Sequence, residues 1–310
     1  MQLIMVLLGS ILGLTYGYDG DGFVFSSNIC LFAGLTLIMP TLFNFKLGDI
    51  KLIIEYRTLI IKGFLVNYIF IPIVAVAIGL LTGSFGVAAG LFLLSVLSGG
   101  GMVMHWIKKS KADTSLGFIL LFINLVFISL SLLMLHVFGM YTSELFGETY
   151  YDDISVSNFA KAVIILLIVI PFIASRIVLF IPPLKNFINR NRKYMSNISI
   201  FIILFYLFGL QSSQLLFELY DFEPELMYIS IFAVLGFYLS IFVIAKLTYN
   251  LNSPQEKSAF WHSITRYITL ALVISTFTTK TFGVAMILPI MFAYIVQIPF
   301  AIYIDKRLAN

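Results

Sequence analysis

Long hydrophobic runs, separated by charged or glycine- and proline-rich breaks, make up most of the chain. Most of these runs approach the roughly 20 apolar residues that a helix needs to cross a bilayer. They predict ten membrane spans: Leu3–Tyr18, Ser27–Phe45, Leu59–Leu81, Gly86–Ile107, Ser115–Phe138, Phe159–Ile181, Ile198–Phe217, Leu226–Ala245, Tyr267–Phe282 and Val284–Ile304. We therefore expect an all-α membrane protein of ten transmembrane helices.

The connections between these spans alternate in charge along the sequence. Lys and Arg residues gather in the connections after the second, fourth, sixth and eighth spans and in the C-terminal tail, whereas the other connections are mainly acidic. Because basic loops stay on the cytoplasmic side, this pattern places both termini in the cytoplasm. We expect a multi-pass protein of the plasma membrane, with the bacterial inner membrane as its location.

The acidic connection Gly139–Asn158 divides the chain into two sets of five spans. Five is odd, so equivalent spans in residues 1–138 and 159–310 would cross the membrane in opposite directions, as in the inverted repeats of secondary transporters. In this interpretation residues 1–310 form a single transmembrane transporter unit, and the fourth span corresponds to the ninth. A second long connection, Pro182–Asn197, is basic and is predicted to be a cytoplasmic loop.

The fourth span is interrupted at mid-length by Ser98, Gly99, Gly100 and Gly101. Each glycine costs a helix roughly 1 kcal/mol relative to alanine, and backbone groups released within hydrocarbon cannot bind water. Such a break is tolerated inside a bundle or beside a cavity, and broken helices form the solute sites of secondary transporters. The alternative is close helix packing, although three adjacent glycines lack the four-residue spacing of that motif.

The ninth span carries a second polar cluster, formed by Ser275, Thr276, Thr278, Thr279, Lys280 and Thr281. Polar interruptions at matching places in two repeats mark transporter sites, so we expect the solute to bind between this cluster and the glycines. Alternatively, the hydroxyl groups bond to carbonyls of their own helix, and Lys280, like Arg266, extends to the membrane interface. Asn124, near the middle of the fifth span, either bonds to a neighbouring helix or lines the site.

The composition supports a membrane protein and argues against other classes. Hydrophobic residues make up 60% of the chain, charged residues 11%, and the mean hydropathy is +1.03, too apolar for a soluble protein of this length. The net charge is +4, and most of the basic residues lie in the connections on one side of the membrane. This distribution gives no indication of a nucleic-acid partner. Cys30 is the single cysteine, and neither metal-ligand spacing nor a catalytic set occurs, so we expect no enzyme, no catalytic residue and no cofactor.

The stretch Ser98–Asn124 resembles the bile/arsenite transporter superfamily, which includes the bile acid:sodium symporters and the arsenite permeases. Gly99 and Gly100 stand where the symporters have a glycine pair, and a short half-helix and basic residues follow them. Ala33–Lys46 and Leu288–Asp305 are also similar in character to that superfamily. The resemblance implies a core domain, a panel domain, and a solute site where broken fourth and ninth helices cross.

The resemblance departs from the superfamily at the ion and metalloid ligands. Where the symporters hold sodium with a Ser-Asn pair, a Glu and a Gln, the corresponding positions here look like Val103, Met104, Leu272 and Thr276. Gly99 stands where the arsenite permeases have their thiol ligand. Sodium prefers several oxygen ligands, so the expected sodium ligands are largely absent and sodium coupling stays open.

Together these features predict a secondary transporter that moves a small organic anion across the lipid bilayer by alternating access. The alternative is an arsenite-type metalloid permease or a passive channel on the same fold. We further expect the ammonium group of Lys280 to supply the positive charge that sodium brings in the symporters. The sequence identifies neither the solute nor the oligomeric state.

Overall fold

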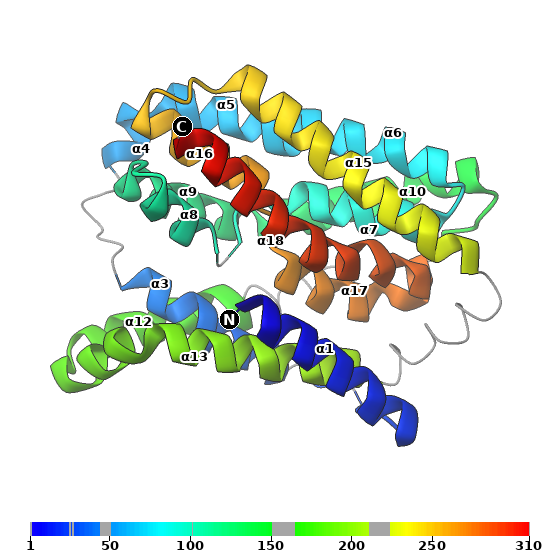
Figure 1. The fold of residues 1–310 in the computed structure, drawn as a ribbon, viewed down its shortest axis with the longest axis horizontal. Coiled ribbons are helices and arrows are strands. Elements are labelled where there is room, and N and C mark those ends of the chain that lie inside the picture. Colours follow the sequence, from blue (N-terminus) through cyan, green and yellow to red (C-terminus); the bar gives the residue numbers. More distant parts are fainter. Residues whose placement is uncertain are drawn as a thin grey trace. The chain divides into compact units, whose positions relative to one another are not determined.

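The computed structural model describes residues 2–24, 26, 28–43, 51–100, 102–150, 165–210 and 224–309. Every regular element in this part of the chain is a helix, as the hydrophobic pattern predicted (Figure 1). The chain folds into two compact units. One unit comprises Met1–Phe45 and Ser155–Phe222, and the other comprises Lys46–Ile154 and Glu223–Asn310, so each unit takes segments from both halves of the sequence.

The first unit is built around the pairing of the two helices that lie at the two ends of its described part. Its elements are α1 (Gln2–Asp19), α2 (Asn28–Ala33), the π-helical turn η1 (Gly34–Ile38), α3 (Met39–Leu42), the π-helical turn η5 (Ile165–Val169), α12 (Ile170–Leu179) and α13 (Pro182–Phe208). Helix α1 packs along α13. Gly9 allows the close approach, because a Cβ atom there would lie 2.9 Å from the carbonyl oxygen of Phe201.

The prediction of a loop at Pro182–Asn197 was wrong, because these residues form the first half of α13. Pro182 and Pro183 suit a helix start, where the first N–H groups have no partner within the helix. Helix α13 then leaves the direction of α12 at an angle of 115°. Lys and Arg are good helix formers, so the polarity of this stretch indicates exposure rather than the end of a helix.

The second unit holds most of the long helices. Its elements are α4 (Lys51–Glu55), α5 (Arg57–Leu65), the π-helical turn η3 (Val66–Phe70), α6 (Ile71–Thr82), α7 (Phe85–Val96), α8 (Val103–Lys109), α9 (Thr114–Val126), α10 (Ile128–Thr142), the 3₁₀ turn η4 (Ser143–Phe146), α15 (Pro224–Thr248), α16 (Pro254–Ile264), α17 (Ile268–Phe282), the 3₁₀ turn η6 (Val284–Met286) and α18 (Ile287–Ala309).

Helix α7 is the centre of the second unit (Figure 1). Every residue from Phe85 to Val96 is buried, as expected for a helix that is hydrophobic on all sides. Helices α6, α10, α17 and α18 pack around it. Glycines allow two of these contacts: a Cβ atom at Gly79 would lie 2.7 Å from that of Ala88, and one at Gly86 would lie 2.9 Å from the carbonyl oxygen of Phe282.

Four helical stretches in the described residues are long and apolar enough to cross a membrane. They are Arg57–Thr82, Ile128–Phe146, Pro224–Thr248 and Val284–Arg307, and the bent pair α12–α13 adds a fifth if it is one span. The fourth and fifth predicted spans are each divided into two shorter helices, and the ninth contains the single helix α17, whose 15 residues are fewer than a full span needs. The ten-span, inverted-repeat arrangement therefore stays a prediction.

Candidate functional site

The first helix interruption lies at the predicted glycines. Helix α7 ends at Val96 and α8 begins at Val103. Between them the backbone of Gly99 adopts φ +66°, the left-handed region that side chains disfavour. Gly101, which the sequence also assigns to the site, lies outside the described residues.

The second interruption separates α16 from α17 and lies at Thr265–Tyr267. The sequence placed the polar interruption at Ser275–Thr281, but α17 runs unbroken through those residues, so that position was wrong for the helix break. Helix α16 itself was expected to be a connection between spans. The break contains neither glycine nor proline, and Thr265 is held in an extended conformation with φ −89° and ψ 133°.

The two interruptions cross each other and pair like short antiparallel strands. Gly99 N–H donates to the carbonyl of Thr265 at 2.8 Å, and Tyr267 N–H donates to the carbonyl of Leu97 at 2.9 Å. A Cβ atom at Gly100 would lie 2.8 Å from the carbonyl oxygen of Arg266, so glycine permits the close approach of the two backbones. The backbone groups that both breaks release thus satisfy each other.

Arg266 lies at this crossing and does not extend to a membrane interface, which corrects the expectation from the sequence. It is 1% exposed. Its Nη1 donates to the carbonyl of Ser95 at 2.9 Å, and its Nη2 donates to the carbonyl of Ser263. Its Nε has no hydrogen-bond partner among the described residues. Since neither of the two ion pairs found in that part of the chain includes Arg266, no described carboxylate pairs with it.

The last carbonyl groups of α7 are each bound by a residue distant in sequence. Ser95 accepts from Arg266, Val96 accepts from the Ser131 hydroxyl at 2.8 Å, and Leu97 accepts from Tyr267 N–H. A helix end leaves such groups without intrahelical partners, and within a membrane other protein groups must bind them. The end of α7 therefore depends on α10, on the second break and on Arg266.

The side chain of Gln297, on α18, binds the backbone of the second break. Its Oε1 accepts from the N–H of Arg266 at 2.6 Å and from the hydroxyl of Tyr238 at 2.9 Å. Gln297 is 5% exposed and Tyr238 is fully buried. One amide oxygen therefore connects α18, α15 and the α16–α17 break.

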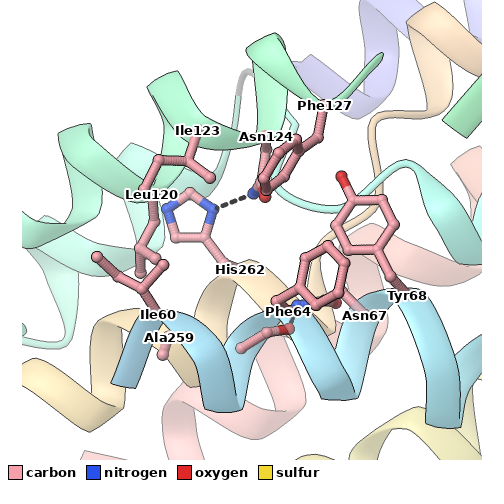
Figure 2. Close-up of a pocket in the computed structure, with 11 residues that line it drawn as sticks. Ile60, Phe64, Asn67, Tyr68, Leu120, Ile123, Asn124, Phe127, Ala259 and His262 are labelled. Atoms are coloured by element: carbon pink, nitrogen blue, oxygen red, sulfur yellow. Dashed lines mark hydrogen bonds between the residues drawn. The ribbon is translucent and has the colours of Figure 1, made fainter. Parts of the chain in front are cut away.

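A pocket lies beside the crossing, between α5, η3, α9 and α16 (Figure 2). Asn124 and His262 contact each other directly in its lining, with Asn124 Nδ2 3.2 Å from His262 Nδ1 (Figure 2). His262 Nε2 lies 2.9 Å from the carbonyl of Gly117. If the Asn124 amide donates to Nδ1, the histidine is neutral and its Nε2–H donates to Gly117, so each group has a suitable partner.

The pocket also has an aromatic wall and an amide oxygen that has no partner among the described residues. The rings of Phe64 and Tyr68 stack at 4.9 Å, and Phe127 meets both edge-on at 5.6 and 5.7 Å. Asn67 Nδ2 donates to the Ser263 hydroxyl at 3.2 Å, whereas its Oδ1 has no partner in the described part of the chain. The pocket thus combines apolar ring surface with unused hydrogen-bond capacity, and its cavity of about 20 Å³ is large enough for about one water molecule.

The structure brings four of the predicted site residues together. Ser98, Gly99 and Gly100 form the crossing, and Asn124 both bonds to His262 and lines the pocket. Along α17, Ser275 donates to the carbonyl of Leu272 and Thr278 to that of Ile274, so both bond to their own helix. Thr279 lies further along α17, and the side chains of Thr276 and Lys280 lie outside the described part.

The sequence did not identify His262, Arg266 or Gln297 as site residues. His262 and Arg266 fell in what was predicted to be a connection, and Gln297 lies alone in an apolar run. An arginine followed at once by the apolar segment of α17 was the one available signal, because ionisable residues beside or within a span default to a functional hypothesis.

These features define a class of protein: an all-helical membrane protein whose interior backbone is opened at two crossing helix breaks, as in secondary transporters. The family model of the sodium bile acid symporter family matches residues 31–218, which is more than half of the chain. The chain belongs to this family, and it is a membrane transporter of the bile acid/sodium symporter type. The match includes the first break and Asn124 and ends before the second break. A search among curated proteins found no matching sequence.

Proposed function

We propose that the protein is a secondary transporter that moves a small organic anion across the membrane by alternating access. The observation that carries this proposal is the crossing of two interrupted helices beside a pocket. Ser98 Oγ, Asn67 Oδ1 and Arg266 Nε are buried there without partners among the described residues. Buried polar atoms are nearly always paired, so orphan atoms at one place favour a site that a solute or water completes.

The charge of the crossing favours an anion. The guanidinium of Arg266 is buried, and its described partners are carbonyl groups rather than a carboxylate, so the crossing holds a cation without an anionic side chain beside it, and an anion is favoured there over a cation. An arsenite-type permease is less well supported, because the two crossing segments, Leu97–Gly100 and Thr265–Tyr267, contain no cysteine that could act as a thiol ligand. The aromatic wall would contact the apolar body of the solute.

The test is uptake of radiolabelled solutes into proteoliposomes that contain the purified protein. We expect saturable uptake and counterflow of one class among cholate, benzoate, short dicarboxylates and arsenite, with an organic anion preferred. Flux that rises in proportion to concentration without saturating, and without counterflow, would instead identify a passive channel. Preferred uptake of arsenite would support the metalloid permease.

We propose a membrane topology with ten spans and both termini in the cytoplasm of a bacterial inner membrane. The basic start of α13 would then be cytoplasmic and the acidic segment Gly139–Asn158 external.

In a Cys30→Ser background, we expect a membrane-impermeant maleimide to label Ser155→Cys in intact cells. The same reagent should label Arg192→Cys only after the cells are permeabilised, because the positive-inside rule keeps that segment in the cytoplasm. The opposite labelling pattern would reverse the proposed orientation.

A further inference from the structure

Two helix C-termini converge on the side chain of Arg266. Ser95 lies in the last turn of α7 and Ser263 in the last turn of α16, and their carbonyl groups accept from Nη1 and Nη2 of the same guanidinium. The C-terminus of a helix carries a partial negative charge of about half an elementary charge. One guanidinium therefore balances roughly the charge of two helix ends.

This combination of groups is one that transporters use to bind a coupling ion. In discontinuous membrane helices, the C-terminal ends of half-helices and the unwound carbonyl groups coordinate sodium or a proton. Here the guanidinium of Arg266 already binds two carbonyl groups of this kind, those of Ser95 and Ser263. A sodium ion placed beside the same carbonyls would be repelled by the guanidinium charge at short range. The described residues provide no group of three or more His, Cys, Asp or Glu side chains as an alternative cation site.

We propose that Arg266 is a built-in cation that takes the place of the coupling ion, so that this transporter binds and moves its anion without sodium. The proposal rests on the proposed anion transport. The ionisable side chains that interact with the charge of Arg266 are Tyr68, Tyr238 and Tyr249. Tyrosine hydroxyls are uncharged near neutral pH, so none of these three groups adds a negative charge beside Arg266.

Transport of an anion without a co-transported cation moves net charge across the membrane. Arg266 stays in the protein throughout the cycle, so each monovalent anion crosses the membrane without a co-transported cation and carries one negative charge with it. Uptake should therefore be faster when the liposome interior is positive. A carrier that moves two sodium ions with each monoanion would show the opposite dependence on voltage.

The first experiment uses the wild-type protein in proteoliposomes, with radiolabelled cholate and benzoate as probes. We expect initial rates in sodium chloride and choline chloride to agree within about twofold, because the protein supplies the cation itself. An inside-positive potassium diffusion potential should increase uptake. Uptake that requires sodium would overturn the inference and leave the proposed transport function intact.

A second measurement does not depend on transport of either probe. The thermal unfolding midpoint of the purified wild-type protein should shift by less than about 1 °C between sodium and choline chloride, because a ligand that does not bind the native state cannot stabilise it. Arg266→Ala opens the carbonyl oxygens, and this variant should be stabilised by sodium but not by choline. Arg57→Gln, which removes an exposed arginine of the same unit, should behave as wild type.

The outcomes separate the two proposals. Sodium-specific stabilisation of the wild-type protein would show that a sodium site persists and would overturn the role of Arg266. If Arg266→Ala does not fold, the wild-type comparison still decides. Absence of anion uptake in every salt counts against the proposed function, whereas the unfolding midpoints continue to test the built-in cation.

Discussion

Replacing Gly99 with alanine should abolish solute uptake and strongly destabilise the second unit. Gly99 has φ +66°, and a left-handed backbone costs a residue with a Cβ atom roughly 1–2 kcal/mol. The new Cβ would also overlap His262 Nδ1 and lie 2.9 Å from Asn124 Nδ2. Overpacking of a buried site costs a further 1–3 kcal/mol or so, and here it would displace the pair of side chains that lines the pocket.

Gly83→Ala is the matched control for this experiment. Gly83 also has φ +66°, but a Cβ atom there meets nothing within 4 Å. The control should therefore show only the backbone cost, measured as the thermal unfolding midpoint in detergent, and should keep transport activity. In a His262→Ala background, Gly99→Ala should cost less than it does in the wild-type background, because only the contact with Asn124 Nδ2 then remains. Equal effects of the two glycine substitutions in the wild-type background would mean that the contact with His262 is unimportant.

Replacing Gln297 with leucine should have the second large effect. The leucine would leave the N–H of Arg266 and the hydroxyl of Tyr238 without their acceptor, and both groups are buried. Each buried polar group left unpaired costs about 1–3 kcal/mol, so the variant should lose roughly 2–6 kcal/mol of stability. The same change loosens the second break, so anion uptake should fall as well.

Two further variants test whether the loss arises from those two hydrogen bonds. In a Tyr238→Phe background, Gln297→Leu should cost less, because only the N–H of Arg266 then loses its partner. Tyr294→Phe, on the same helix, removes the hydrogen bond of 2.7 Å that the tyrosine hydroxyl donates to Thr269, so the partly exposed Thr269 hydroxyl loses only a donor. It should be nearly neutral. A Gln297→Leu protein that unfolds at the wild-type temperature would contradict this account of α18.

The sequence predicts the helical class and the first break because local signals determine both. Long apolar runs leave few alternatives to membrane helices, and three adjacent glycines weaken a helix wherever it lies. Asn124 was also identified locally, as an amide within an apolar run. Its partner was not, because the contact between Asn124 and His262 joins residues 138 apart in sequence.

The second break could not be predicted from its own residues. Thr265, Arg266 and Tyr267 contain no helix-breaking signal, and their extended backbone is stabilised by hydrogen bonds to Leu97, Gly99 and Gln297. Tertiary contacts thus override local propensity. The hydroxyl cluster of α17 led to the wrong position for the second break, because its polarity is visible in the sequence but does not interrupt the helix. The hydroxyls of Ser275 and Thr278 bond to carbonyl groups of their own helix.

The end of α7 also has a consequence for biosynthesis. Ser95 and Arg266 are 171 residues apart, and ribosomes add about 5–20 residues per second, so roughly 10–30 s separate the synthesis of the two partners. During that interval the carbonyl groups of Ser95 and Leu97 lack the partners that they have in the folded protein. Hydrocarbon is a poor environment for such groups. The segment around the glycines should therefore stay close to water or to the translocation machinery until α16 and α17 emerge, and it enters the bilayer interior only once they do.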